Sequence, residues 1–166
     1  MKKIINKQSN AKHCFVCGVG NPIGLHAKFF ETDEREVVAL FTPTANHQGY
    51  PIRLHGGVAA SILDETIGRA IQIDAPDIWG VTAELNVSYK KPLPCDSELR
   101  AVGRVTKQNR MLYEGTGEIY TPDGEIAISA KAKYYKMSIR KISEGFNHDD
   151  WQVYSDDNDP TEIDID

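Results

Sequence analysis

Residues 55–73 read HGGVAASILDETIGRAIQI, and this stretch decides the fold. Residues 57–73 are predicted to form one helix, with apolar side chains around nearly its whole circumference. A helix that is apolar on all sides is usually enclosed by other structure. Two glycines at its mouth and carboxylates in its middle are costly, because glycine loses backbone entropy and a buried carboxylate loses hydration. This combination indicates a functional site.

Two carboxylates, Asp64 and Glu65, lie in the middle of the predicted helix in different surroundings. Glu65 has Arg69 four residues on, so an ion pair along the helix explains it. Asp64 shares its face with apolar residues and has no charged neighbour at helical spacing. Desolvation there raises the pKa of a carboxylate toward that of a general base. Asp64 is therefore the main catalytic candidate, with a capped or solvated aspartate as the alternative, and Glu65 is kept as a second candidate.

Gly56 and Gly57 leave backbone N–H groups at the helix N-terminus, where the macrodipole is positive and no side chain blocks a ligand. Such a terminus binds anions, including an oxyanion. Gly57 and Asp64 are about 10 Å apart along the axis at 1.5 Å per residue, so one helix cannot bring both groups to one carbonyl. We therefore expect a homodimer of two antiparallel helices, in which the glycine end of one meets Asp64 of the other.

Length and composition suit a single domain: the chain has 166 residues, of which 40% are hydrophobic. Its net charge of −5 is unevenly distributed, because residues 142–166 hold nine acidic residues and no Lys or Arg. The remaining 19 basic and 15 acidic residues make a mildly basic body, which favours an anionic small ligand and falls short of a nucleic-acid-binding surface. Residues 139–166 are predicted to be an acidic, disordered tail, although their aromatic side chains could dock part of it.

Residues 1–24 form an N-terminal segment with a Cys-x-x-Cys-Gly turn at Cys14 and Cys17. A closed zinc site needs four ligands and the sequence has no second such turn, so a small buried turn is favoured over zinc or a redox dithiol. Three cysteines in total argue against a disulfide framework. No stretch is apolar enough for a signal sequence or a membrane span, so the sequence predicts a cytoplasmic protein with no membrane partner.

The remaining pattern is strand, strand, helix and then four strands. Strands are predicted at residues 25–31, 36–41, 81–89, 98–106, 111–120 and 125–137. The short turns between the last four predict an antiparallel meander. Residues 81–89 alternate apolar and polar side chains, as in a strand with one polar face. The predicted fold class is α+β, an antiparallel sheet wrapped around one long central helix over residues 25–138.

With the glycine and aspartate motif, this layout resembles the hotdog fold. The segments at 14–25, 47–49, 55–65 and 82–92 resemble the PaaI-like (phenylacetate-type) hotdog thioesterases of the 4HBT superfamily. The likeness runs from about residue 13 to residue 137, and the cysteine segment marks a subgroup. It implies an acyl-CoA thioesterase, a hydrolase whose substrate is an acyl-CoA and which needs no cofactor or metal. It also implies a homodimer, often paired into a homotetramer.

The resemblance assigns roles to four residues. Asp64 corresponds to the catalytic carboxylate, Gly57 to the backbone donor that polarises the thioester carbonyl, and His55 to the residue that braces the turn. Thr82 corresponds to the hydroxyl that helps to hold the attacking water. Two alternatives stay open: His55 as the general base, and Thr82 as an ordinary strand residue.

Other candidates come from the loop before the helix and from strand ends. Relatives commonly have an asparagine shortly before the His-Gly-Gly turn, but Asn46 is too distant here, and Gln48 is the substitute. The substrate-binding candidates are groups that could meet the coenzyme at the helix mouth or at strand ends: Gly56, Asn86, Lys90, Lys91 and Arg110.

Two other function classes share the fold. A hotdog enoyl-CoA hydratase would carry an aspartate and a histidine on a short hydration motif, which is not found here. A non-catalytic acyl-CoA binding or sensing module would keep the pocket and the dimer. Asp64 and the lack of a basic recognition helix favour the enzyme, but binding without turnover stays an alternative, because fold and motif do not guarantee activity.

Overall fold

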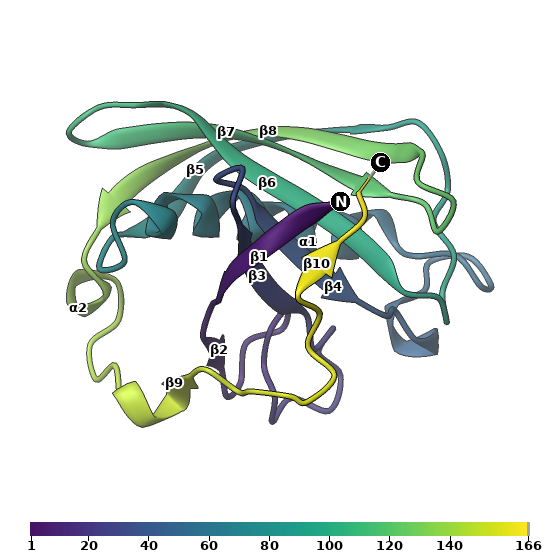
Figure 1. Ribbon diagram of the computed structural model, residues 1–166, viewed down its shortest axis with the longest axis horizontal. Helices are drawn as coiled ribbons and strands as arrows, with labels where there is room; N and C mark the ends of the chain where they lie inside the picture. The colour runs from purple at the N-terminus through teal and green to yellow at the C-terminus, as the bar shows by residue number, and fades with distance from the viewer. Residues whose placement is uncertain (166) are drawn as a thin grey trace.

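The central element of the fold is helix α1, Gly56–Arg69, in a computed structural model that describes residues 1–165 (Figure 1). A 3₁₀ turn, η2 (Ala70–Ile73), continues it, so the predicted helix is an α-helix with a tightened last turn. Its core side chains are fully buried: Ala59, Ile62, Leu63 and Ile67. The prediction of one central helix is confirmed, and the side of the helix that carries Asp64 is only half-buried in this chain.

An eight-stranded antiparallel sheet wraps around α1, in the order β10-β1-β3-β4-β6-β7-β8-β5. Its strands are β1 Lys2–Lys7, β3 Lys28–Thr32, β4 Val37–Phe41, β5 Trp79–Tyr89, β6 Leu99–Gln108, β7 Leu112–Tyr120, β8 Ile126–Met137 and β10 Glu162–Ile163. A two-stranded sheet pairs β2 Asn10–Ala11 with β9 Trp151–Gln152. The short helices are η1 Ala45–His47, α2 Ile139–Ile142 and η3 His148–Asp150. The predicted α+β class is confirmed.

One part of the predicted topology is wrong. Strands β6, β7 and β8 form a meander, but β5 pairs with β8, and β6 pairs with β4 instead. Strand β5 therefore lies at the edge of the sheet. The reason is that the connection at residues 90–98 carries the chain from one edge of the sheet into its interior, and local turn signals do not specify such a crossing.

Glycines on β6 and β7 let α1 lie directly against the sheet. A Cβ atom on Gly103 would lie 2.6 Å from the main-chain oxygen of Thr66, and one on Gly115 would lie 2.5 Å from the Ile67 side chain. Real Cβ atoms do not approach other atoms this closely. The helix thus has a fixed position relative to the strands that carry the candidate site.

The C-terminal segment differs from the prediction of a disordered tail. Within residues 139–165, β9 pairs with β2, and β10 pairs with β1. Ile163 and Ile165 are buried against an apolar patch made of Phe30, Val38 and Val102 on the face of the sheet away from α1. Successive strand residues point to opposite faces, so this second face needs a cover. In Figure 1 the yellow C-terminal segment runs beside β1 and brings the two termini together.

The eight-stranded sheet takes strands from all three predicted segments, 1–24, 25–138 and 139–166. Within residues 1–165, no helix has the length and apolar character needed to cross a membrane. The cytoplasmic location stays a prediction.

Candidate active site

The mouth of α1 is organised by His55, which is the helix N-cap in an extended conformation. Its Nδ1 accepts the N–H of Gly57 at 2.9 Å. Because an accepting ring nitrogen carries no proton, the neutral ring holds its proton on Nε2. His55 therefore has no free basic nitrogen in this geometry, which argues against the general-base alternative and fits a residue that braces the turn.

The unpaired donor at this mouth belongs to Gly56. The N–H of Gly57, expected to polarise a carbonyl, is already bonded to His55, whereas the N–H of Gly56 has no acceptor within residues 1–165. It is the first N–H of the helix, where no intrahelical partner exists. The structure thus shifts the candidate oxyanion donor by one residue.

Tyr89 supports this turn from the end of β5. Its hydroxyl donates to the main-chain oxygen of Gly56 at 2.7 Å, and a Cβ atom on Gly56 would lie 3.4 Å from its ring. Tyr89 was assigned no role from the sequence. Leu85 and Val87 pack against the core, and side chains two residues apart on a strand share a face. This spacing could have placed Tyr89 on the side of β5 that faces α1.

The loop before α1 closes on itself. Gln48 forms an isolated β-bridge with Leu54, and its side-chain oxygen accepts the N–H of Ile52 at 3.1 Å. A Cβ atom on Gly49 would lie 3.2 Å from the His55 ring, so the loop packs directly on that histidine. Gln48 lies next to the helix mouth. Its side-chain NH₂ group has no acceptor in the described part of the chain.

Asp64 lies half-buried on α1, facing β5. The Thr82 hydroxyl donates to its two carboxylate oxygens at 2.9 and 3.1 Å, and the Tyr134 hydroxyl donates to its main-chain oxygen at 2.8 Å. Burial raises the pKa of Asp64 above its ordinary value, although the Thr82 hydrogen bond acts in the opposite direction. A carboxylate in this state holds a proton more readily than a solvated aspartate, as a general base requires.

Thr82 reaches Asp64 because of a β-bulge. The register between β5 and β8 shifts between Thr82 and Glu84, so Thr82 points toward α1 while Leu85 and Val87 do the same further along the strand. Asn86 consequently lies on the opposite face of β5 from Thr82. The structure does not bring Asn86 to the aspartate within one chain.

A pocket of about 220 Å³ opens beside Asp64. Its other lining residues come from the end of α1, the start of β5, β8 and the C-terminal segment: Glu65, Gly68, Arg69, Gln72, Trp79, Gly80, Thr82, Tyr134 and Trp151. Trp79 and Trp151 meet edge to face with ring centroids 4.6 Å apart. The docked C-terminal segment therefore contributes an aromatic wall to this pocket, which the sequence did not predict.

Glu65 is engaged elsewhere. Arg69 pairs with its Oε1 at 2.7 Å, which confirms the predicted ion pair along the helix, and the Cys14 thiol donates to its Oε2 at 3.2 Å. Both carboxylate oxygens of Glu65 are bonded to protein groups. Neither oxygen is therefore free to act on a substrate beside Asp64.

Within one chain, the charged substrate-binding candidates lie near opposite ends of the long strands. Lys90 and Lys91 line a hollow next to Gly56 and Tyr89, and Lys91 pairs with Glu125. Arg110 lies in the turn between β6 and β7, next to Leu112, which is opposite Tyr135. Tyr89 is opposite Ile128, seven residues earlier on β8, so the two groups are separated by about 23 Å at 3.3 Å per residue.

The glycine and aspartate groups are also separated within one chain. Gly56 and Asp64 are about 12 Å apart along the axis of α1.

The hotdog arrangement of sheet and helix, with a carboxylate and a helix mouth on the same exposed side, defines the class of this protein: a hotdog-fold domain with a candidate acyl-transfer site.

Comparison with known proteins gives the same family as the sequence motifs. A family model described as the thioesterase superfamily (4HBT) matches residues 53–128. The acyl-coenzyme A thioesterase THEM4 of Mus musculus is 38% identical over 117 residues, which is 70% of this chain and 50% of that protein. The chain thus spans about half the length of this curated relative.

Solved structures agree with the fold. A Bacillus halodurans protein crystallised with CoA is 25% identical, with a TM-score of 0.62 over 70% of this chain and 77% of that one. The E. coli PaaI protein is 19% identical, with a TM-score of 0.61 over 69% of this chain and 81% of that one, a likeness of fold alone. The resemblance to PaaI-like hotdog thioesterases is confirmed at the level of superfamily and fold.

Proposed function

We propose that this protein hydrolyses acyl-CoA thioesters to a free acid and CoA. The observation that carries the proposal is the pairing of an unsatisfied helix N-terminal N–H, at Gly56, with a partly desolvated carboxylate, Asp64, on the exposed side of one helix. The thioesterase superfamily match and the acyl-CoA thioesterase relative support the substrate class.

The chemistry needs little more than these two groups. A thioester carbonyl is weakly stabilised by resonance and its thiolate leaves readily, so one aligned N–H dipole and one carboxylate suffice. The Gly56 N–H polarises the carbonyl, and Asp64 either activates a water held by Thr82 or attacks the carbonyl itself. His55 and Tyr89 hold the Gly56 turn in place from its two sides.

A homodimer completes the site. Strand β5 has 11 residues and is paired on one edge only within residues 1–165, and a long open edge is a template for pairing with another copy. Antiparallel pairing of two β5 strands sets the two α1 helices side by side in opposite directions. The Gly56 end of one chain then meets Asp64 of the other, and Lys90 and Lys91 of one chain approach Arg110 of its partner, where they face the CoA phosphates.

The experiment that tests this function is thiol release from a panel of short, long and aromatic acyl-CoAs, with wild type compared to Asp64→Asn. We expect turnover of part of the panel by wild type and its loss in the variant, which keeps the shape and removes the charge. Unchanged turnover in the variant would refute the role of Asp64. No turnover by wild type, with CoA ligands still raising the melting temperature, would favour a non-catalytic acyl-CoA binding module.

A further inference from the structure

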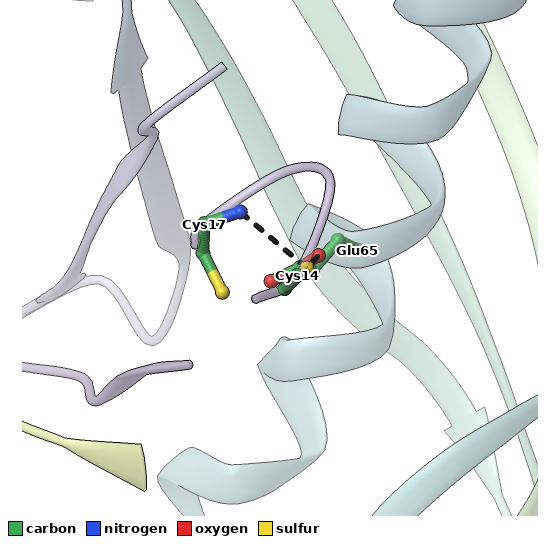
Figure 2. A group of neighbouring side chains, drawn as sticks. All are labelled: Cys14, Cys17 and Glu65. Carbon is green, nitrogen blue, oxygen red and sulfur yellow. Dashed lines mark hydrogen bonds between the residues drawn. The ribbon is translucent and has the colours of Figure 1, made fainter. Parts of the chain in front are cut away.

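The Cys14–Cys17 turn packs against α1 at Glu65. Figure 2 shows Cys14, Cys17 and Glu65 gathered at this contact. Together with Arg69 they form a group that we call the thiol cluster. The Cys14 sulfur, the Cys17 sulfur and a Glu65 oxygen all lie within 4.8 Å of one another. None of these contacts is used in the proposed hydrolysis.

The backbone of the turn holds the two sulfurs together. The Cys14 sulfur accepts the N–H groups of Val16 and Cys17 at 3.3 and 3.4 Å. A Cβ atom on Gly18 would lie 2.2 Å from the main-chain oxygen of Cys14, so only glycine fits after the second cysteine. Two backbone donors directed at one sulfur stabilise its thiolate form.

The charged members of the cluster face both sulfurs. Arg69, which is 4% exposed, places its guanidinium 3.2 Å from the Cys17 sulfur and 2.7 Å from Glu65. The Cys14 thiol donates to the other Glu65 oxygen. A buried guanidinium lowers the cost of a negative sulfur, and a carboxylate beside the Cys14 thiol can accept its proton.

This arrangement disfavours a metal ion. The described residues offer three donor groups here, whereas structural zinc sites use four protein ligands. A divalent cation between the sulfurs would also lie close to the fixed positive charge of Arg69. The same charge favours a thiolate, so the donor set fits sulfur redox chemistry better than cation binding.

We propose that Cys14 and Cys17 form a redox-active dithiol that low-molecular-weight disulfides oxidise to an intramolecular disulfide, with Cys14 as the attacking thiol and Cys17 as the resolving thiol. Cys14 is half-buried and within reach of a small reagent, whereas Cys17 is fully buried. The Cys17 side chain lowers the pKa of the Cys14 thiol, against burial and Glu65, which raise it, whereas the Cys14 side chain and burial both raise the pKa of the Cys17 thiol.

The electrons and protons balance in two exchanges. The Cys14 thiolate attacks the disulfide RSSR, which gives a Cys14–S–S–R mixed disulfide and releases RS⁻. The Cys17 thiol loses its proton and attacks the Cys14 sulfur, which forms the Cys14–Cys17 bond and releases a second RS⁻. The protein loses two protons and two electrons, and RSSR is reduced to two thiols.

The test is oxidation of the reduced protein by glutathione disulfide in defined glutathione buffers, followed by intact mass and peptide mapping. We expect a loss of two hydrogens and a Cys14–Cys17 linkage. The Cys95→Ser variant is the matched control, because Cys95 is also buried and lies outside the cluster; it should be oxidised like wild type. The inference does not depend on thioester hydrolysis, since the readout is the disulfide itself.

Single variants assign the order of attack. Cys17→Ser should stop at a mixed disulfide between Cys14 and glutathione, and Cys14→Ser should react about tenfold or more slowly, because only the buried thiol remains. Arg69→Gln should shift the equilibrium about tenfold toward the disulfide, or about 30 mV toward a lower potential, because the reduced form loses its positive neighbour. The cysteine variants keep the test valid if the arginine variant does not fold.

Three results would overturn the proposal. Binding of one equivalent of Zn²⁺ that protects both thiols, without a disulfide under oxidation, would make this a metal site. Two thiols that resist both glutathione disulfide and Zn²⁺ would make it a structural turn. Equal reaction rates for Cys14→Ser and wild type would reverse the assigned order of attack.

Discussion

The proposed catalytic carboxylate is Asp64, and its protonation depends on two opposing contacts. Burial beside the apolar side of α1 favours the neutral acid, and the Thr82 hydroxyl favours the carboxylate. The net direction is a raised pKa. In either proposed mechanism Asp64 must be ionised, so activity falls as the pH falls through this pKa, and Thr82 sets how far into the acid range activity extends.

Thr82→Val tests this balance. The substitution keeps the shape and removes the hydrogen bond that stabilises the carboxylate, so the pKa of Asp64 rises further. We expect the acid limb of the kcat/KM profile to move to higher pH, with a smaller change at alkaline pH, where Asp64 is ionised in both proteins. Thr116→Val is the matched control, because Thr116 lies on the face of β7 away from α1 and outside the β5 edge. If the acid limb of the kcat/KM profile does not move, Thr82 does not influence the ionisation of Asp64.

Gly56 allows a direct test of a backbone donor. Gly56→Pro removes its N–H at the first helical position, where proline is well tolerated, and His55 before it is already in the extended region that proline requires. Gly56→Ala is the matched control, because it also adds a Cβ against Tyr89 but keeps the N–H. Loss of one such donor costs about 10²–10³ in kcat.

We expect kcat for Gly56→Pro to fall by that amount relative to Gly56→Ala, with circular dichroism unchanged. Equal rates for the two variants would show that another group polarises the carbonyl.

The sequence singled out candidate site residues, but it did not show the contacts between them. Asp64, His55 and the two glycines stand out because glycine and carboxylate are costly where they occur. It could not show which glycine N–H stays free, since that depends on the rotamer of the His55 ring. Nor could it show that Thr82 points inward, because the bulge that turns it is a property of the β5–β8 pairing.

At the scale of elements, the strands were predicted nearly to their ends and the β6–β7–β8 meander was predicted, whereas the pairing of β5 with β8 and of β6 with β4 was not. The alternation of apolar and polar residues indicates which side chains of a strand are buried, but it does not indicate which strand pairs with which. The N-terminal strands and the C-terminal segment were missed for a related reason. Strand β10 has two residues and no pattern of its own, and it is held by the patch that it covers.

The cover provided by β10 predicts a specific loss of stability. Ile163 is 5% exposed against Phe30, Val38 and Val102, so Ile163→Ala should lower the free energy of unfolding by about 2 kcal/mol in urea titrations. Glu162→Ala, on the same strand and solvent-exposed, should change it by less than about 0.5 kcal/mol. Truncation after Lys141 should lower the melting temperature more than either. Equal stability of the truncated and full chains would mean that the segment does not dock in solution.

At the scale of the whole molecule, the two groups of the proposed site are far apart within one chain. The Gly56 end and Asp64 are about 12 Å apart on a rigid helix, and the open edge of β5 lies beside both. A rigid spacing of this size cannot be closed by side-chain movement. In the proposed homodimer, a second copy related by a twofold axis closes it, and the same symmetry produces two identical sites per dimer.

This arrangement predicts that two inactive variants restore each other. In a mixed dimer of Asp64→Asn and Gly56→Pro, one site receives both mutated groups and the other receives both native ones. Random association of equal amounts makes half of the dimers mixed, so about a quarter of the wild-type sites return. Thiol release by the co-expressed pair, with the mixed dimer quantified by native mass spectrometry, measures this fraction. Asp64→Asn co-expressed with Asp64→Ala should recover nothing. If mixed dimers form and the first pair also recovers nothing, both groups of a site belong to one chain, and the helix spacing must be bridged by the substrate rather than by the partner subunit.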